Sequence, residues 1–293
     1  MESSPVILAQ HYVHDLLPDL IKIGGIPIRY YSLAYLLGLL LAWWFLKSLS
    51  QKKLIALNPL QISELVVPYA LLGILIGGRL GYVCFYGDKE YLLKPWRVLY
   101  IWEGGMASHG GILGVVVAMY LFARKYRVPF LHLVDLTALT APMGLFLGRI
   151  ANFINAELWG RGPTDVPWAV IFPNSHLAGQ PPFPRHPSQI YEAIGEGLIL
   201  FLVLLALHRQ YLPRKGALSA VFGFGYGVAR IVCEQFREPD KTNGKDLWEF
   251  AHLGITRGQL LTVLVLVVSV ALAVHSARER PQQWTPPPLQ SSG

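Results

Sequence analysis

The sequence predicts an all-α, polytopic membrane protein with seven transmembrane helices. Apolar residues make up 53% of the 293 residues, and charged residues only 15%. The charged residues gather between long apolar stretches, which is typical of integral membrane proteins. Each of seven apolar stretches has roughly the 17–25 residues that a hydrocarbon core of about 30 Å requires. They are 29–48, 63–86, 108–124, 131–153, 187–208, 216–236 and 257–277.

The first two segments carry polar or aromatic residues at positions that call for an explanation. The first opens on Tyr30, Tyr31 and Tyr35, which suit an aromatic belt at the membrane interface, although Tyr31 could also face a binding site. The second contains the stretch Gly77–Tyr82, which places Arg79 inside the membrane. We expect this arginine either to reach outward toward water or to join a site that binds substrate.

The third, fourth and fifth segments are interrupted or preceded by glycine and proline. The third follows the glycine-rich stretch Gly104–Gly111, and the fourth carries Pro142, which membrane helices tolerate. The fifth opens on Arg185-His186-Pro187-Ser188-Gln189. Ser188 predicts an N-cap and Pro187 a helix-entry residue, so capping explains much of this motif, although a functional role for His186 stays open.

Basic loops alternate with nearly neutral ones along the chain. The loops after the first, third and fifth segments contain no acid and hold Lys47, Lys52, Lys53, Arg124, Lys125, Arg127, Arg209, Arg214 and Lys215. By the positive-inside rule these loops are cytoplasmic, so the N-terminus is periplasmic and the C-terminus cytoplasmic. The long connections 87–107, 154–186 and 237–256 then lie outside the cytoplasm, where we expect them to form a small head.

Composition and motif searches exclude several functions. The net charge of +7 follows membrane orientation, so we expect no nucleic-acid partner. Cys84 and Cys233 lie in apolar segments without metal-ligand spacing and are interpreted as small buried hydrophobic residues. No HExxH, Gly-x-Ser-x-Gly, P-loop or His/Cys cluster occurs, so no metal or cofactor is expected. We predict one integral membrane domain, 1–280, and a disordered cytoplasmic tail, 281–293, made mainly of Pro, Gln and Ser.

The sixth segment predicts a polar stripe inside the membrane. Tyr226, Arg230, Glu234 and Arg237 follow one another at spacings of four, four and three, which stacks them on one helix face. One interpretation is a structural ladder in which Glu234 neutralises Arg230 or Arg237. The other is that the stripe forms part of a functional site, because ionisable residues at membrane depth are usually functional.

Arg149 and Asn152, three residues apart, predict a second polar face at the end of the fourth segment. An arginine near the middle of a membrane helix costs on the order of 3 kcal/mol. The next acid at helical spacing on this face is Glu157. Two arginines that converge from different helices suit a phosphate, whose oxygens accept paired hydrogen bonds from guanidinium groups.

The glycine-bracketed His109 is the candidate base at the start of the third segment. Its glycines allow the backbone to approach a ligand closely, although they also suit tight helix packing. A lone histidine is most often structural. At the outer mouth of an arginine-lined site, however, a neutral imidazole is basic enough to remove a proton near pH 7.

Five motifs together resemble one known family along nearly the whole chain. They are Gly77–Tyr82, Gly104–Gly111, Gly148–Arg161, Arg185–Glu192 and Gly225–Arg237. They are similar to those of the bacterial prolipoprotein diacylglyceryl transferases, and Arg149–Arg161 is the most specific stretch. The resemblance implies a multi-pass enzyme of the bacterial inner membrane, with its active site facing the periplasm, that takes part in lipoprotein biosynthesis.

The resemblance also implies substrates and site residues. The enzymes of the family move the diacylglyceryl group of phosphatidylglycerol to the lipobox cysteine of a prolipoprotein, which forms a thioether and releases a glycerol phosphate. Residues matching those used for lipid binding or activity are His109, Arg149, Asn152, Glu157 and Arg230, and matching supporting positions are Tyr31, Tyr226 and Glu234. In this sequence Ala151 and Ala156 stand where the family often has glycine, and an added methyl group could crowd the backbone near Asn152.

The chemistry of this reaction fits the residues. A cysteine thiol has a pKa near 8.5 and must become a thiolate to attack. The nucleophile belongs to the substrate, and Arg149 and Arg230 can stabilise charge on the departing phosphate. His109 is the candidate base, although Tyr226, a carboxylate or the phosphate itself could accept the proton.

A transporter or lipid-handling protein that binds anionic phospholipid is the alternative, since such proteins also bury arginines that face anionic cargo. Transporters are commonly built from internal repeats with paired broken helices. We find no convincing repeat between the two halves of this sequence. Formation of a thioether on a lipobox peptide would distinguish an enzyme from a protein that only binds lipid.

The charge pattern makes a prediction about topology. A cysteine introduced near Asp165 should react with a membrane-impermeant thiol reagent from the periplasmic side, and a cysteine in the 209–215 loop should react only after the cytoplasm is made accessible. The check is a cysteine-accessibility scan. Labelling near Asp165 that requires access to the cytoplasm would refute the orientation.

Overall fold

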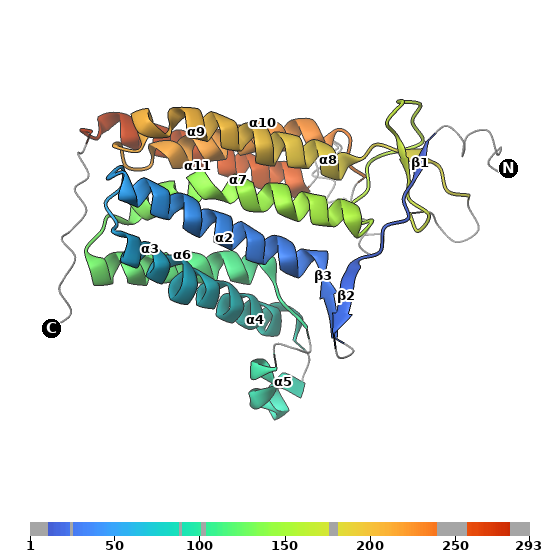
Figure 1. Ribbon diagram of the computed structural model, residues 1–293, viewed down its shortest axis with the longest axis horizontal. Coiled ribbons are helices and arrows are strands. Elements are labelled where there is room, and N and C mark those ends of the chain that lie inside the picture. Colours follow the sequence, from blue (N-terminus) through green and yellow to red (C-terminus); the bar gives the residue numbers. More distant parts are fainter. Residues whose placement is uncertain are drawn as a thin grey trace. The chain divides into compact units, whose positions relative to one another are not determined.

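The computed structural model describes residues 11–23, 26–87, 90–100, 104–175, 181–238 and 257–281. Each predicted segment corresponds to one helix or to a run of consecutive helices (Figure 1). They are α2 (Tyr30–Gln51); α3 (Pro59–Glu64), η1 (Leu65–Leu71) and α4 (Leu72–Tyr86); α6 (Ser108–Tyr126); α7 (Phe130–Ile154); α8 (Ser188–Glu192), η4 (Ala193–Ile199) and α9 (Leu200–Tyr211); α10 (Ala217–Glu234); and α11 (Arg257–Arg278).

Five of these runs are long and apolar enough to cross a membrane. They are Tyr30–Gln51, Pro59–Tyr86, Phe130–Ile154, Ser188–Tyr211 and Ala217–Glu234. α6 is not among them, and in α11 the apolar part, Thr262–Arg278, is shorter. The protein is therefore a mostly helical membrane protein, and seven crossings and their orientation stay predictions.

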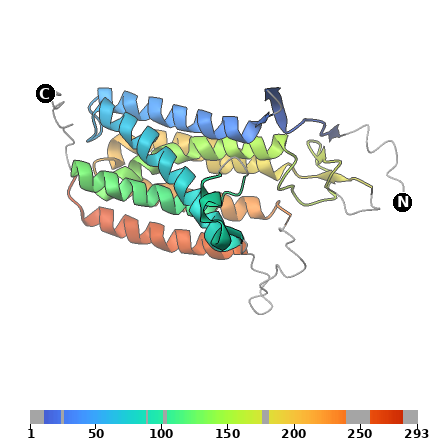
Figure 2. The ribbon, with the colours of Figure 1, turned by 90° about the horizontal axis from the view of Figure 1, so that it is seen from below.

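The expectation of an all-α protein missed two small sheets. The first sheet has the order β1 (Tyr12–Val13), β4 (Val170–Ile171), β5 (Pro184–Arg185), and β1 pairs with β4 in parallel. The second is the antiparallel hairpin of β2 (Asp19–Ile23) and β3 (Ile26–Arg29), which Figure 2 shows in dark blue at the start of α2. Strands of two to five residues are too short for an alternating pattern to reveal them in the sequence.

The chain divides into two compact units. The first contains Met1–Leu41, Ala138–Tyr211 and Gly216–Glu279, and the second contains Ala42–Thr137, Leu212–Lys215 and Arg280–Gly293. Helices α2 and α7 each contribute residues to both units. The predicted tail beyond 281 and most of the predicted connection 237–256 lie outside the described residues, so their predictions stay open.

In the second unit, glycines bring α4 and α6 into close contact. A Cβ added to Gly77 would lie 2.4 Å from the Gly110 carbonyl oxygen, and one added to Gly114 would lie 2.0 Å from that of Gly73. Only hydrogen fits at these positions, so the two backbones approach as in small-xxx-small membrane packing. Gly110 therefore serves helix packing, which is one of the two roles expected of the glycines around His109, and Gly77 of α4 takes part in the same packing.

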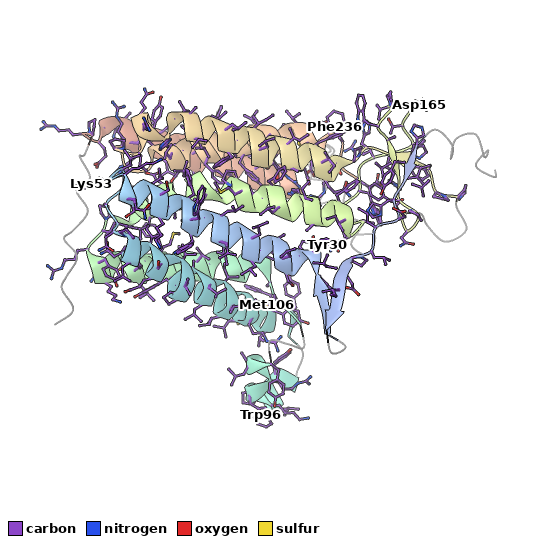
Figure 3. All side chains as sticks on the ribbon, viewed as in Figure 1. Tyr30, Lys53, Trp96, Met106, Asp165 and Phe236 are labelled. Carbon is purple, nitrogen blue, oxygen red and sulfur yellow. The ribbon has the colours of Figure 1, made fainter. Side chains whose placement is uncertain are left out.

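In the first unit, the connection between α7 and α8 is tied to the end of α10. The Gly160 N–H donates to the His186 carbonyl at 3.1 Å, and the Arg161 N–H donates to the Phe236 carbonyl at 2.8 Å. Figure 3 shows Phe236 and Asp165 at the same end of this unit as Tyr30. The described parts of this connection, 155–175 and 181–187, thus form a cap at one end of these helices, and the predicted head outside the cytoplasm stays a prediction.

Arg185 lies at the centre of this cap. The buried guanidinium donates to the Ser175 hydroxyl at 3.0 Å, the Ser175 carbonyl at 3.0 Å and the Gly160 carbonyl at 3.1 Å. Burial lowers the pKa of Arg185, and the carboxylate of Glu238, 3.6 Å away, opposes that shift. The residue is therefore part of the framework.

The predicted N-cap at Ser188 is wrong. α8 begins at Ser188, its N-cap is Pro187, and no side chain caps it. The Ser188 hydroxyl instead donates to the Leu158 carbonyl at 3.0 Å, since that carbonyl belongs to the neighbouring connection and lies within reach. The serine therefore joins α8 to the cap.

Two residues of the turn after α7 have left-handed backbones: Ala156 with φ 52° and Leu158 with φ 55°. This conformation costs a residue with a Cβ roughly 1–2 kcal/mol, whereas glycine adopts it freely. The left-handed backbone explains why glycine is favoured at position 156. Ala151 is different, because it is buried in the last turns of α7 with helical geometry.

We therefore predict opposite effects for two matched substitutions. Ala156→Gly should raise the stability by up to about 1 kcal/mol, because it relieves the left-handed strain. Ala151→Gly should lower it by about 1 kcal/mol, the usual cost of glycine inside a helix. Thermal melting of the detergent-solubilised protein measures both, and equal destabilisation by the two substitutions would contradict the assigned backbone at Ala156.

Candidate active site

The first unit contains a cluster of buried arginine and glutamate side chains between its helices. Arg149 of α7 approaches Glu192 with one terminal nitrogen, at 3.0 Å, and Glu196 with the other, at 3.1 Å. Arg230 of α10 reaches the same two carboxylates, at 2.5 Å to Glu192 and 3.4 Å to Glu196. Two guanidinium groups from different helices thus converge on one pair of carboxylates. The sequence predicts that Arg149 and Arg230 converge on a phosphate, whereas the anions that they contact in the structure are side chains.

Two further charged residues extend this cluster toward the end of α10. Glu234 lies 2.9 Å from the second terminal nitrogen of Arg230, one turn along the helix. Arg237 lies 3.6 Å from Glu192. Glu234 therefore pairs with Arg230, as expected if the stripe is a structural ladder. This pair is, however, only the outer part of a larger cluster. We call the six residues Arg149, Arg230, Arg237, Glu192, Glu196 and Glu234 the arginine–glutamate cluster.

Glu192 and Glu196 were missed as site residues by the sequence reasoning. A usable signal existed, because two acids four residues apart inside an apolar segment lie on the same helix face and are costly unless they are paired. Both carboxylate side chains are 0% exposed. In the sequence no acid stands at helical spacing from Arg149 before Glu157, whereas the structure supplies acids from another helix.

Glycines in the π-helical turn η4, which carries Glu196 and directly follows Glu192, bring the two carboxylates close to their partners. A Cβ at Gly197 would lie 2.6 Å from the Phe146 Cβ of α7, so α7 packs directly against η4. A Cβ at Gly195 would lie 3.7 Å from the Cys233 Sγ of α10. π-helical turns occur frequently at functional sites. Here the turn and its glycines hold the acids between two helices.

A second polar network lies at the end of α7 in the same unit. The Tyr31 hydroxyl donates to the Glu157 carboxylate at 3.0 Å, and the Asn152 amide donates to the Tyr31 hydroxyl. The Gln189 amide donates to the Glu157 carbonyl oxygen at 2.5 Å. Asn152 follows Arg149 by one turn of α7, so this network continues the cluster toward the capped end. The structure therefore brings together three predicted site residues from two distant parts of the chain: Tyr31 from one, and Asn152 and Glu157 from the other.

Tyr226 occupies the position one turn before Arg230 on α10, as the predicted stripe requires. Its ring stacks on Phe222 with centroids 6.0 Å apart, and its hydroxyl lies within electrostatic range of Glu196, Arg230 and Arg149. Tyr226 thus belongs to the same site.

Arg79 belongs to the second unit and is fully engaged by backbone carbonyls. Its guanidinium donates to Val98 at 2.9 Å, Arg97 at 2.8 Å, Gly104 at 2.5 Å and Gly105 at 3.2 Å. The side chain is buried, so it holds the connection that precedes α6 instead of reaching outward. Its predicted contact with substrate stays a prediction.

His109 lies in the first turn of α6, directly after the turn that Arg79 holds. Gly104 and Gly105 have φ values of +82° and +77°, which glycine adopts without strain. The His109 side chain is exposed. It belongs to the second unit, whereas Arg149 and Arg230 belong to the first, so its approach to the phosphate site stays a prediction.

His186 contacts aromatic side chains of α8 and of the segment after α10, and the functional role left open for it stays untested. Its Nδ1 lies 3.1 Å from the Tyr191 hydroxyl, which accepts a hydrogen bond from the Trp168 indole at 2.6 Å. Its ring also packs edge-on against Phe236. These contacts hold the start of α8 against the end of α10.

Comparisons with known proteins agree with one another. A family model described as prolipoprotein diacylglyceryl transferase matches residues 18–275. A phosphatidylglycerol–prolipoprotein diacylglyceryl transferase of Rhodospirillum rubrum is 45% identical over 267 residues, which cover 90% of this chain and 93% of the relative. Relatives with the same name in Methylocella silvestris and Rhodospirillum centenum are each 45% identical, over 89% and 88% of this chain and 94% and 91% of the relative.

Proposed function

The chain belongs to the prolipoprotein diacylglyceryl transferase family, and we propose that it transfers the diacylglyceryl group of phosphatidylglycerol to the thiol of the lipobox cysteine of a prolipoprotein. The reaction forms a thioether and releases glycerol 1-phosphate. A transporter is not favoured, because the relatives are named as transferases.

One observation carries the assignment of the site. Arg149 and Arg230, which belong to different helices, both form ion pairs with Glu192 and Glu196, at nitrogen–oxygen distances between 2.5 and 3.4 Å. The phosphodiester of phosphatidylglycerol presents two non-bridging oxygens that share one negative charge. Guanidinium forks bind carboxylate and phosphate with the same geometry. These arginines are therefore suited to hold the lipid phosphate and to stabilise the charge that develops on it as the glycerol C–O bond breaks.

The other residues have supporting roles in this proposal. Asn152, Glu157 and Tyr31 form the polar network that continues from Arg149, where it can orient the glycerol headgroup. Tyr226 and Glu234 keep Arg230 in place on α10. His109 removes the proton from the substrate thiol, and Arg79 holds the turn that carries His109.

The location follows from the family and from the charge pattern. We propose that the protein lies in the bacterial inner membrane, with the Arg149 end of the helices facing the periplasm. The prolipoprotein arrives through its signal peptide, and phosphatidylglycerol enters from the bilayer. The nucleophile is the thiol of the substrate, which explains why neither Cys84 nor Cys233 needs to be reactive. Cys233 is buried as expected, whereas the expectation that Cys84 is buried is wrong, because Cys84 is exposed on α4.

The direct test uses purified protein in detergent with phosphatidylglycerol and a lipobox peptide. We expect a thioether-linked diacylglyceryl peptide, detected by mass spectrometry, together with glycerol phosphate. A peptide in which serine replaces the lipobox cysteine is the control and should stay unmodified. Lipid binding without any thioether product would favour the transporter instead.

We predict that Arg149→Lys lowers turnover by about 10²–10³-fold, the usual loss when one positioned donor to a developing charge is removed. Lysine keeps the positive charge but loses the planar fork that now bridges Glu192 and Glu196. The measurement is kcat with phosphatidylglycerol, together with a check of membrane insertion. Arg209→Lys, an exposed arginine at the end of α9, is the matched control. Near-normal turnover of Arg149→Lys would exclude a bidentate role.

His109→Gln tests the proposed base. Glutamine keeps much of the size and hydrogen bonding but not the basicity, so turnover should fall by about 10²–10⁴-fold. Higher pH should partly restore it, because the substrate thiol then ionises unaided. His275→Gln, an exposed histidine in the last turn of α11, should behave as wild type.

The pH profile separates two explanations of a loss. Wild-type turnover of His109→Gln at every pH would eliminate His109 as the base. A loss that high pH does not restore would instead assign His109 to positioning the lipid or the turn.

A further inference from the structure

Two buried side-chain amide oxygens beside Glu157 accept no hydrogen bond from any residue that the structure describes. They are Oε1 of Gln189, in the first turn of α8, and Oδ1 of Asn155, which directly follows α7. Gln189 is 0% exposed. A buried oxygen without a donor is destabilising, because it has given up its hydrogen bonds to water and gained none in return. Such atoms are rare in folded proteins, so two of them at one place require an explanation.

The neighbours of both amides fix which atom is the oxygen. Nε2 of Gln189 lies 2.5 Å from the Glu157 carbonyl oxygen, and Nδ2 of Asn155 lies 3.3 Å from Oε1 of the Glu157 carboxylate. A carbonyl oxygen or a carboxylate only accepts hydrogen bonds, so the nitrogen of each amide must face it. The oxygen is then on the other branch of the planar amide group. Both residues are thus anchored on Glu157 through nitrogen, and each keeps an acceptor for another group.

The two oxygens lie next to the arginine–glutamate cluster, on its capped side. Gln189 precedes Glu192 by three residues on α8, which is about 4.5 Å along the helix axis. Asn155 follows Asn152 by the same spacing, and its N–H donates to the Ala151 carbonyl at 2.9 Å, so it continues the last turn of α7. Residues three apart share a helix face. A group bound at the cluster can therefore extend from it toward both amides.

We propose that Gln189 and Asn155 accept hydrogen bonds from the two hydroxyl groups of the headgroup glycerol, and that they thereby select lipids whose headgroup carries hydroxyls. This inference rests on the proposed function, because it places the lipid phosphate at Arg149 and Arg230. The headgroup glycerol is esterified to that phosphate and has two free hydroxyls. The site offers one unused amide oxygen for each of them.

The chemistry of the two oxygens explains the selection. An amide oxygen accepts and never donates, so it pairs with a hydroxyl and gains nothing from an alkyl headgroup. Both oxygens are covered from solvent, as are the carboxylates of Glu192 and Glu196. The headgroup therefore reaches them only as the phosphate enters the cluster. A site built to hydrogen-bond a hydroxyl rejects an analogue that lacks it, because the polar groups of the site are then left unpaired.

A lipid without headgroup hydroxyls tests the proposal. The purified protein in detergent receives a lipobox peptide and either dioleoyl phosphatidylglycerol or dioleoyl phosphatidylpropanol, which has the same charge and three headgroup carbons but no hydroxyl. Transfer from either lipid forms the same thioether, and only the departing phosphate monoester differs. We expect kcat/KM to be about 10–100-fold higher for phosphatidylglycerol, which is up to about tenfold for each hydrogen bond.

Gln189→Met assigns the selection to the amide, because methionine keeps the length of the side chain and removes the acceptor. We expect kcat/KM to fall about tenfold with phosphatidylglycerol and to stay unchanged with phosphatidylpropanol. Asn155→Leu should narrow the preference in the same way. Ser188→Ala is the matched control: it removes the neighbouring hydrogen bond from α8 to the Leu158 carbonyl, at 3.0 Å, and should leave the preference between the two lipids as in the wild type.

The outcomes separate this inference from the function on which it rests. Equal use of both lipids by the wild type refutes the inference and leaves the transferase intact, whereas absence of thioether with either lipid refutes the proposed function. Equal losses with both lipids in Gln189→Met would make that residue structural and overturn the assignment. Faster use of dioleoyl phosphatidylethanolamine than of phosphatidylglycerol would assign the oxygens to an ammonium group instead. Asn155→Leu and the wild-type preference carry the test should Gln189→Met not fold.

Discussion

Ionised side chains inside a bilayer require partners, and this constraint governs the first unit of the protein. Arg149 and Arg230 are tolerated within apolar helices because Glu192 and Glu196 neutralise them at distances of 2.5 to 3.4 Å. Removing one member of a buried pair typically costs about 3–5 kcal/mol, since the other charge is left uncompensated. The cluster therefore holds three helical runs together, and in the proposed function it also supplies charge for the chemistry.

The same constraint explains how a structural cluster can serve catalysis. An arginine that is held by a carboxylate is already oriented, so little reorganisation is needed when a phosphate takes the place of that carboxylate. The described part of the cap is fixed to the residues that follow α10 by backbone hydrogen bonds, and Glu157 of the cap accepts from Tyr31, which accepts from Asn152 of α7. A rigid polar end on an apolar bundle suits a lipid whose headgroup reacts while its chains stay in the membrane.

In the second unit, side-chain hydrogen bonds and helix packing position the turn that precedes α6. Arg79 donates to carbonyls of Arg97, Val98, Gly104 and Gly105, and so it ties the 3-10 helix η2 (Pro95–Leu99) and the turn before α6 to α4. The close packing of α4 and α6 fixes both sides of that turn. His109 owes its position at the start of α6 to this arrangement.

The sequence by itself determined the helical segments and the spacing within each helix, because apolar length and helical periodicity are local properties of the chain. The stripe from Tyr226 to Arg237 and the Arg149–Asn152 face were predictable for that reason. The partners of the arginines were decided only by tertiary structure. Arg149 meets Glu196 across 47 residues and Arg230 meets Glu192 across 38, and both meetings depend on how η4, with its glycines, packs between α7 and α10. Likewise, Arg79 was predictable as a buried cation, but its four carbonyl partners belong to a connection whose path only the folded backbone defines.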